Sequence, residues 1–311
     1  MRSFILYVLT GLFLSVVIII SFAGGISQFV SFINSANMLL VVWLWALGFA
    51  IASFVFGAIT KDNSWIDRIY SILPVGFAWY YAYRSGFAFT TCIGALLISF
   101  WGVRLTFNFA RKGGYCGMED YRWPFLRQNK ITNPFLWEFF NFSFISLFQS
   151  GLFVLFTYPI YSLTFYTADN MPVLFWVFAV LGIALVCYEF TADQQQWNFH
   201  TAKKASAQQK SFPSKYTGDV KNGFLSQGLF ALSRHPNYFG ELGFWWTIWL
   251  LAFSLSWNPV FSGFFGPLVL TCVMTGSTIL AESISSSKYP EYLNYKKKVI
   301  SPVIPWFPKS E

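Results

Sequence analysis

The stretch NMLLVVWLWALGFAIASFVFGAI, residues 37–59, contains no charged side chain. A helix needs about 20 predominantly apolar residues to cross the hydrocarbon core of a bilayer. Residues 37–59 meet that requirement, so they predict a transmembrane helix.

The composition of the whole chain extends this prediction. The 311 residues are 55% hydrophobic and 22% aromatic, and only 11% are charged. An ordinary soluble domain carries about 25% charged residues, because its surface must be covered with polar groups. The composition therefore predicts an integral membrane protein.

Apolar segments of similar length recur along the chain. Eight of them are expected to be helical: residues 4–23, 37–59, 69–84, 87–109, 139–161, 171–190, 237–256 and 260–281. The third is short and contains Pro74. Only Ser85 and Gly86 separate it from the fourth, so the two form either a tight hairpin or a re-entrant pair. The first is too long for the core of a signal peptide and is counted as a span. The predicted fold class is all-α: a polytopic membrane helix bundle of about eight spans, with seven to ten allowed.

Basic residues give an independent test of these segments. With the N-terminus in the cytoplasm, eight spans place all but two of the 21 Lys and Arg residues on the cytoplasmic side, as the positive-inside rule requires. The exceptions are Arg84, on the opposite side, and Arg104, inside a span. Both termini are therefore expected in the cytoplasm. The net charge of +8 is explained without nucleic acid as a partner.

Cysteine and histidine are too sparse for a disulfide framework or a catalytic metal centre. No CxxC or HExxH motif is present, and there are only two histidines. The four cysteines are expected to be reduced core residues: Cys92, Cys116, Cys187 and Cys272.

Polar chemistry is concentrated in SRHPNYFGE, Ser233–Glu241, directly before an apolar segment. Pro236 lacks a backbone N–H and disfavours helical geometry at His235, so it suits the first turn of a helix. Asn237 and Glu241 are four residues apart and share one face of that helix. Since a Glu in contact with lipid costs several kcal/mol, Glu241 should face the bundle interior. The alternative is an interfacial cap in which Arg234 and His235 touch lipid headgroups.

Arg104 lies about one turn inside the cytoplasmic end of its span. Asn108, four residues on, shares its face, which favours a polar track into the bundle over a side chain that snorkels to the headgroups. Arginine suits phosphate contacts, because its guanidinium presents a planar pair of donors. A dinucleotide carrying several phosphates could use the arginines expected on this side: Arg104, Arg111, Arg122, Arg127 and Arg234. Asp193 or Glu241 could accept hydrogen bonds from ribose hydroxyls or a carboxamide. No GxGxxG follows a strand, so a soluble dinucleotide fold is excluded as the binder.

Four blocks of sequence resemble the steroid 5α-reductase-like membrane enzymes, and in particular their mainly uncharacterised bacterial and protist branch. The blocks are GLFALSRHPNYFGELGFWW (228–246), DNSWIDRIYSILPV (62–75), WGVRLTFNFARKGGYCGMEDYRW (101–123) and SISSSKYPEYLNYKKKVISPVIPWFP (283–308). The resemblance implies one membrane domain over 1–311. Its N-terminal helices, 1–110, would lie on the substrate side, and its C-terminal half, 111–311, would bind NADPH at the cytoplasmic face. The implied reaction reduces an activated C=C bond of an enone type in a steroid- or lipid-like substrate that arrives from the bilayer.

The resemblance also implies residue roles. Asn237 and Glu241 match positions that contact the nicotinamide end of the cofactor, and Asp193 matches an acid on the preceding helix. Glu189 stands where the steroid reductases have Asn. Arg104 and Arg111 match positions that reach the phosphates, and Tyr292 and Lys296 lie where the family has Tyr and Arg. The full set of expected cofactor-binding residues is Arg104, Arg111, Asp193, Arg234, His235, Asn237, Tyr238, Glu241, Tyr292 and Lys296.

The proton donor of such a reaction is expected in the N-terminal half. The family's substrate-side Glu has no clear match, so the candidates are Asp67, Tyr70, Tyr80 and Tyr81. A tyrosine, with an ordinary pKa of about 10, stays protonated at neutral pH, whereas Asp67 would need a strongly raised pKa. In the alternative interpretation, Asp67 pairs with Arg68 or Arg104 and the tyrosines belong to the interfacial belt.

Two other functions remain open. Membrane methyltransferases that use S-adenosylmethionine, of the isoprenylcysteine and phospholipid types, share RHPxYxG, but their later helix carries two adjacent acids where LAESIS has Glu282 alone. A non-enzymatic lipid or sterol binder could keep the same scaffold. The expected location is a bacterial inner membrane or the endoplasmic reticulum, with the active site facing the cytoplasm.

Overall fold

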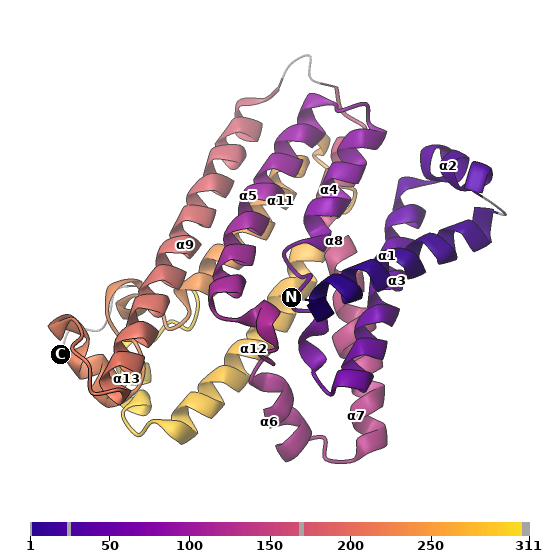
Figure 1. Cartoon of the computed structure of the whole chain (residues 1–311). Coiled ribbons are helices and arrows are strands. Elements are labelled where there is room, and N and C mark those ends of the chain that lie inside the picture. Colours follow the sequence, from indigo (N-terminus) through magenta and orange to yellow (C-terminus); the bar gives the residue numbers. More distant parts are fainter. Residues whose placement is uncertain (1, 24–25, 168–170, 307–311) are drawn as a thin grey trace. The chain divides into compact units, whose positions relative to one another are not determined.

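The computed structural model describes residues 2–23, 26–167 and 171–306 (Figure 1). Regular structure in these ranges is helical, and they contain no strand. The α-helices are α1 Arg2–Ala23, α2 Ile26–Ser35, α3 Met38–Thr60, α4 Leu73–Arg84, α5 Phe89–Arg111, α6 Arg122–Asn129, α7 Pro134–Phe140, α8 Gln149–Leu163, α9 Val173–Ala207, α10 Thr217–Asn222, α11 Pro236–Ser256, α12 Phe265–Lys288 and α13 Tyr292–Lys298. Shorter pieces are η1 Asn63–Trp65, η2 Gly114–Cys116, the π-helical η3 Asn141–Phe148, η4 Ser214–Tyr216 and η5 Gly228–Ala231.

The chain forms two compact units. Unit 1 comprises Met1–Ala179 and Ile248–Gly266, and unit 2 comprises Val180–Thr247 and Pro267–Glu311. Helices α9, α11 and α12 each contribute residues to both units.

Five helices in the described ranges are long and apolar enough to cross a membrane. They are α3, α5, the continuous helix Pro134–Leu163 formed by α7, η3 and α8, α9, and α12. The protein is therefore a multi-pass, all-helical membrane protein, as predicted.

The other three predicted spans are helices that do not qualify as crossings. In helix α1, Arg2–Ala23, the described apolar stretch is Tyr7–Ile20. Helix α4 has 12 residues, about 18 Å, whereas the hydrocarbon core is about 30 Å thick. Helix α11 has the polar residues Asn237 and Glu241 in its first turns. The count of eight spans, and the orientation derived from it, remain predictions.

Helices α4 and α5 form the tight hairpin that was one of the two predicted alternatives (Figure 1). Helix α4 begins only at Leu73, because a polar turn over residues 62–72 takes the place of its expected first residues. Gly102 of α5 lies against this turn, and a Cβ there would come within 2.6 Å of the Ser71 carbonyl oxygen. Small residues allow this close approach of the backbones.

Small residues also bring α1 and α3 together in unit 1. A Cβ on Gly48 would lie 2.7 Å from the Ser15 Cα, and one on Gly11 would lie 2.6 Å from the Phe49 ring. The Ser15 hydroxyl donates to the carbonyl oxygens of Gly11, at 2.7 Å, and Trp45, at 3.2 Å. In lipid, helices associate through such packing and hydrogen bonds, because burial of apolar surface gives little net gain.

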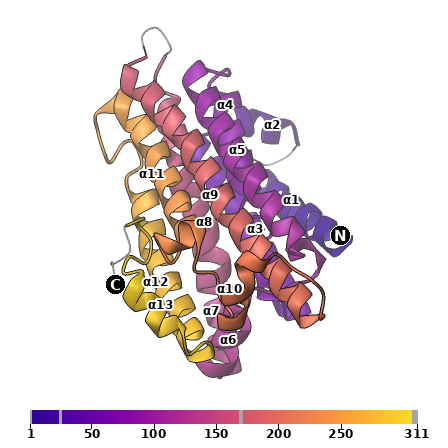
Figure 2. The same cartoon turned by 90° about the vertical axis from the view of Figure 1, so that its left-hand side faces the viewer.

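Helix α9 is longer than a membrane requires (Figure 2). Its 35 residues extend about 52 Å, against a hydrocarbon core of about 30 Å. Its C-terminal part carries Phe199 and Ala202 into a cluster with Tyr216, Leu225 and Phe230 of the following segment. Unit 2 therefore has a hydrophobic core at the end of α9, beyond the length of a span.

The four cysteines form no disulfide, but the prediction that they are core residues was wrong. Cys92 is half-buried, and Cys116, Cys187 and Cys272 are exposed. An apolar segment in a membrane helix has an outward face, so apolar neighbours in the sequence do not establish burial.

Candidate functional site

Pro236 begins α11, as the sequence predicts, and the three residues before it pair with the end of the chain. The Arg234 and His235 amides donate to the carbonyl oxygens of Ser301, at 3.2 Å, and Pro302, at 2.8 Å. The Ser233 hydroxyl donates to the Val303 carbonyl oxygen at 2.7 Å. We call residues 299–306 the strap. It is held along its length by the segment that leads into α11.

The Arg234 guanidinium joins the strap to α12. Its Nη1 donates at 2.6 Å to the carbonyl oxygens of both Val299 and Ile300. Its Nε donates at 2.6 Å to Glu282 Oε1, and Nη2 donates at 3.3 Å to Oε2. All three nitrogens of the buried side chain are thus engaged within unit 2.

Glu282 gathers three residues that the sequence assigned to the cofactor. Besides Arg234, Lys296 Nζ lies 2.8 Å from Oε2, and His235 Nε2 lies 3.4 Å from Oε1. The His235 ring stacks on Tyr238, with 5.1 Å between centroids. Sequence reasoning did not select Glu282 as a site residue, although a lone acid at the end of an apolar helix is a usable signal.

Tyr292 packs in the core beside the strap. Its ring lies 5.1 Å from that of Phe224 and 5.5 Å from that of Tyr295, and all three belong to one cluster with Val299. Tyr295 Oη donates to the Phe230 carbonyl oxygen at 2.6 Å.

Three acids are buried on α9 and on the first turns of α11 in unit 2. Glu189, Asp193 and Glu241 are all buried, with at most 5% of each residue exposed. Gly240 permits the approach, since a Cβ there would lie 2.5 Å from the Glu189 Cβ. Trp245 Nε1 donates to Glu241 Oε1 at 3.0 Å, and Asn237 is half-buried on the same helix. The structure therefore buries the predicted acids on two helices that pack together at Gly240 and Glu189.

Two predicted phosphate ligands lie on α5 in unit 1. Arg104 and Asn108 are both buried, at 5% exposure each, so the polar track predicted along this helix is present. Arg111 Nε and Nη2 donate to Asn108 Oδ1, at 3.0 and 2.8 Å. Asn108 therefore orients Arg111 at the end of the helix.

The four candidate proton donors are distributed through unit 1. The Tyr70 ring packs against those of Phe153, at 5.3 Å, and Trp101, at 5.8 Å. Tyr81 is fully buried, with its ring 5.7 Å from Tyr161. Tyr80 Oη donates to the Ile33 carbonyl oxygen at 3.0 Å and accepts from Arg84 Nη1 at 2.9 Å. Tyr80 therefore serves as an anchor for the end of α2.

Asp67 lies in the polar turn before α4. Its Oδ2 accepts from Trp123 Nε1 at 3.0 Å. Burial raises the pKa of Asp67, and the neighbouring Asp120 carboxylate raises it further, while Arg122 and the hydrogen bonds act in the opposite direction. This raised pKa is what an aspartate acting as an acid would need.

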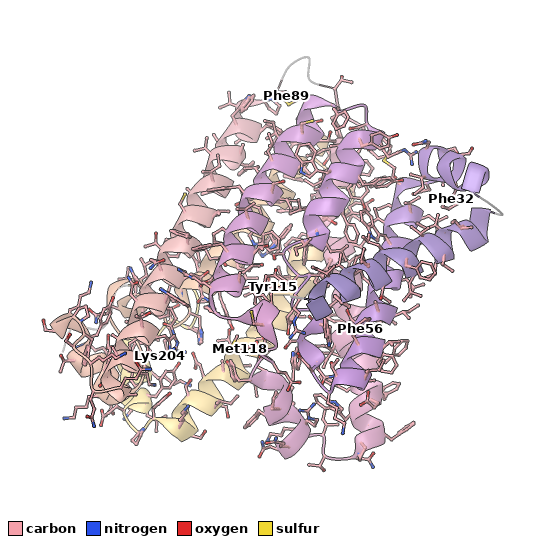
Figure 3. The ribbon with its side chains drawn as sticks, viewed as in Figure 1. Phe32, Phe56, Phe89, Tyr115, Met118 and Lys204 are labelled. Carbon is pink, nitrogen blue, oxygen red and sulfur yellow. The ribbon has the colours of Figure 1, made fainter. Side chains whose placement is uncertain are left out.

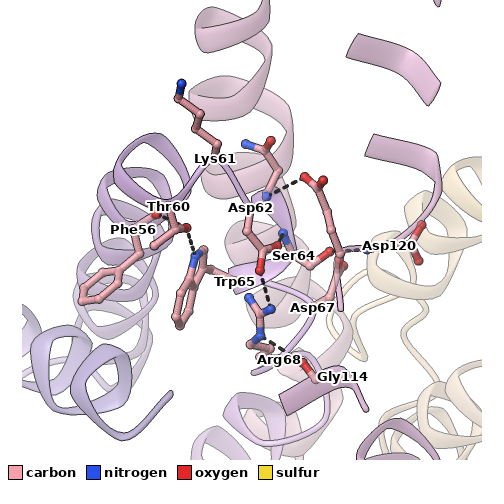
Figure 4. Close-up of polar contacts among 12 residues, drawn as sticks. Phe56, Thr60, Lys61, Asp62, Ser64, Trp65, Asp67, Arg68, Gly114 and Asp120 are labelled. Atoms are coloured by element: carbon pink, nitrogen blue, oxygen red, sulfur yellow. Dashed lines mark hydrogen bonds and ion pairs between the residues drawn. The ribbon is translucent and has the colours of Figure 1, made fainter. Parts of the chain in front are cut away.

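The polar turn also contains a network that the sequence did not predict (Figure 4). Asp62 accepts from the Ser64 amide at 3.0 Å and from Arg68 Nη2 at 2.5 Å. Arg68 Nε donates to the Gly114 carbonyl oxygen at 3.0 Å, and the Asp120 amide donates to Ser64 Oγ at 2.8 Å. The network ties residues 62–68 to residues 114–120 at the end of α5.

These features define a class of protein: a multi-pass helical membrane protein with buried ionisable side chains at the ends of its helices. Residues 53–299 match the family model described as "Protein of unknown function (DUF1295)", and the chain belongs to that family. An uncharacterised protein of Schizosaccharomyces pombe is 33% identical over 290 residues, which cover 88% of this chain and 82% of that protein. No solved structure matches the chain.

Proposed function

We propose that the protein is an NADPH-dependent reductase of an activated C=C bond, of the enone type, in a steroid- or lipid-like substrate. The observation that carries the proposal is the burial of Glu189, Asp193 and Glu241 on α9 and α11, which pack together at Gly240. Buried acids in a membrane protein are costly and most often functional. The resemblance of four sequence blocks to steroid 5α-reductase-like enzymes supplies the reaction class.

The donor and acceptor chemistry of unit 2 fits the nicotinamide and ribose end of NADPH. Asp193 and Glu241 would accept from ribose hydroxyls or the carboxamide, and Asn237 can both donate and accept. When bound, NADPH would supply a hydride. The acids would hold and orient the end of the cofactor that carries it, in a site from which the packed helices exclude water.

The phosphate end of NADPH needs cations. The basic residues predicted to bind it fall into two groups, those that contact Glu282 and those on α5. Arg234 and Lys296 contact Glu282, so they hold the strap, and a phosphate would have to compete with that acid. For the phosphates, the sequence resemblance implies Arg104 and Arg111 of unit 1, where Asn108 orients Arg111. Within unit 2, we assign Arg234, His235, Tyr292 and Lys296 a positioning role through the strap.

Ligand-induced stabilisation tests the proposal. Purified protein in detergent is melted with NADPH, NADH or S-adenosylmethionine, since a ligand that binds only the folded state raises the melting temperature. We expect NADPH to stabilise most, because the 2′-phosphate adds a contact to cations. Stabilisation by S-adenosylmethionine alone would establish the methyltransferase alternative. Stabilisation by none of the three would favour a binder without enzymatic activity.

Matched variants locate the site. Asp193→Asn and Glu241→Gln should each weaken NADPH binding at least tenfold, the size of one hydrogen bond to a charged group. The control is Glu291→Gln, because that acid is exposed and its side chain accepts from Asn294 Nδ2 at 2.9 Å. If both test variants bind NADPH with unchanged affinity, the cofactor does not bind at Asp193 and Glu241. The proposed location, with the active site at the cytoplasmic face of a bacterial inner or endoplasmic reticulum membrane, rests on the charge bias alone.

A further inference from the structure

Arg68 is a buried cation of unit 1, and one nitrogen of its guanidinium makes no hydrogen bond to the described residues. The residue is 2% exposed. Nε donates to the Gly114 carbonyl oxygen, and Nη2 pairs with Asp62 Oδ2. Nη1 is buried and has no hydrogen-bond partner among the residues that the structure describes. Two N–H donors of this guanidinium are therefore available for an acceptor that none of the described residues provides.

Such an arrangement is costly unless something completes it. A buried donor without a partner costs about 1–3 kcal/mol, and more when the group is charged. The turn that carries Arg68 is otherwise well satisfied (Figure 4), since Asp62 and Ser64 each find partners in the network. The unmatched donors are thus a local exception in an ordered network, which is the pattern expected of a ligand-binding group.

The surroundings of Arg68 are aromatic. Trp65 contacts both the guanidinium, at 4.4 Å from the ring centroid, and the Tyr7 ring, at 4.9 Å. Phe56 completes the group, 5.1 Å from Trp65 and 5.4 Å from Tyr7. The Tyr7 hydroxyl is hydrogen-bonded to Ser53 Oγ at 2.5 Å. An apolar molecule with one polar atom suits this environment.

Tyr115 adds a hydroxyl on the same side of unit 1. Figure 3 shows Tyr115 beyond the end of α5 and Phe56 near the end of α3. Burial raises the pKa of Tyr115, while hydrogen bonds with Ser71 and Thr106 and the charge of Arg68 lower it. The charge of Arg68 therefore reaches a phenol that is protonated at neutral pH.

Charge balance decides what the acceptor is. Asp62 already compensates the single charge of Arg68. A phosphate would bring additional negative charge into a buried place at a desolvation cost, and the nearby Arg122 and Arg127 already pair with Asp120 and Glu119. A neutral carbonyl oxygen leaves the balance unchanged and still accepts from Nη1.

We propose that Arg68 Nη1 donates a hydrogen bond to the carbonyl oxygen of the apolar substrate. This inference rests on the proposed function and names its acceptor site. Addition of a hydride to the β carbon of an enone moves the C=C electron pair toward the carbonyl and places negative charge on its oxygen, and one proton from solvent then restores the ketone at the α carbon. Arg68 stabilises that oxygen as the charge develops. Trp65 and Tyr7 line the apolar body of the ligand.

The test measures binding without cofactor, using two pairs of probes that differ only in the ketone oxygen. One pair is cholest-4-en-3-one and cholest-4-ene, and the other is octadec-3-en-2-one and octadec-3-ene. We expect the wild-type protein in detergent to prefer the ketone at least tenfold in one pair. Arg68→Met should abolish the preference. Arg68→Lys should abolish it as well, while keeping a charge beside Asp62, and it decides the question if Arg68→Met does not fold.

The control is Arg122→Gln, which removes a partly exposed arginine that pairs with Asp120 on the same network. It should keep the preference for the ketone. Equal affinity for ketone and alkene in both pairs, or a preference that survives Arg68→Lys, overturns the inference. If NADPH raises the melting temperature but ketone and alkene bind equally well, only the proposed carbonyl site at Arg68 is wrong. If the ketone is preferred but NADPH does not raise the melting temperature, only the proposed cofactor is wrong.

Discussion

At the scale of single residues, the buried acids differ in what they do. Glu282 is surrounded by cations and holds a structure together, with Arg234 at 2.6 Å and Lys296 at 2.8 Å. Asp67 is held by an indole N–H and lies beside another carboxylate. The first is stabilised as an anion, and the second is pushed toward its protonated form.

Glu282→Gln should destabilise the protein strongly. It leaves Arg234 and Lys296 without their shared counter-charge, and Arg234 is buried, so the expected loss is about 3–5 kcal/mol of unfolding free energy. Denaturation by SDS in mixed micelles measures it. Glu291→Gln, at an exposed site, should stay within about 0.5 kcal/mol of wild type. Wild-type stability of Glu282→Gln would mean that the strap is held by backbone contacts alone.

Asp67→Asn should change the pH dependence of stability. The pKa of Asp67 is raised in the folded state, so its protonated form favours folding, and that contribution is lost as pH rises above the ordinary value near 4 toward the folded pKa. The variant should therefore become progressively more stable than wild type as pH rises from about 4. Melting temperatures from pH 4 to 8 measure the difference. In the protein that keeps Asp67, Trp123→Phe removes a hydrogen bond to the anion and raises the folded pKa further, so the loss of stability should still begin near pH 4 but continue to higher pH.

At the scale of elements, close packing of helices creates the site. Gly240 lets α11 approach α9 at Glu189, and Gly102 lets α5 approach the turn before α4. The strap, in turn, is bound to the segment before α11 by Ser233, Arg234 and His235. The start of α11 is therefore fixed both by α9 and by the strap.

Gly240→Ala should be destabilising and should weaken NADPH binding. Alanine is the better helix former, but its Cβ would lie 2.5 Å from Glu189 Cβ, and such overpacking costs about 1–3 kcal/mol. The control is Gly276→Ala on α12, where a Cβ meets nothing within 4 Å and helix propensity should make the change neutral or stabilising. Melting temperatures and NADPH titrations of the two variants test this. Equal behaviour would mean that α9 and α11 pack less closely than described.

At the scale of the whole molecule, five helices in the described ranges are long and apolar enough to cross a membrane, and three predicted spans are not among them. The topology therefore depends on whether α1, α4 and α11 also cross. The charge bias predicts that both chain ends lie in the cytoplasm, since only Arg84 falls on the opposite side.

Cysteine labelling tests that prediction. Single cysteines at positions 3 and 309 should react with an impermeant reagent from the same membrane side. Position 309 lies outside the described residues. The native cysteines must first be replaced, because Cys116, Cys187 and Cys272 are exposed. Labelling of the two positions from opposite sides would rule out an even number of spans.

Local sequence is enough to predict the class of the fold and the location of several polar positions. Charge-free runs such as 37–59 must be helical in lipid, where every backbone polar group needs an internal partner. The same cost argument predicted correctly that Glu241 is buried and that Pro236 begins a helix. These features depend on local sequence and on the solvent around it, so no tertiary information was required.

Which polar residues contact one another depends on how the chain folds. Arg234 and Glu282 are 48 residues apart, and Arg68 and Gly114 are 46 apart, so neither contact has a signal in local periodicity. Composition likewise could not distinguish lipid-facing from core positions for the cysteines. The unmatched nitrogen of Arg68 appears only when all its neighbours are placed, because a missing partner is a property of the folded surroundings.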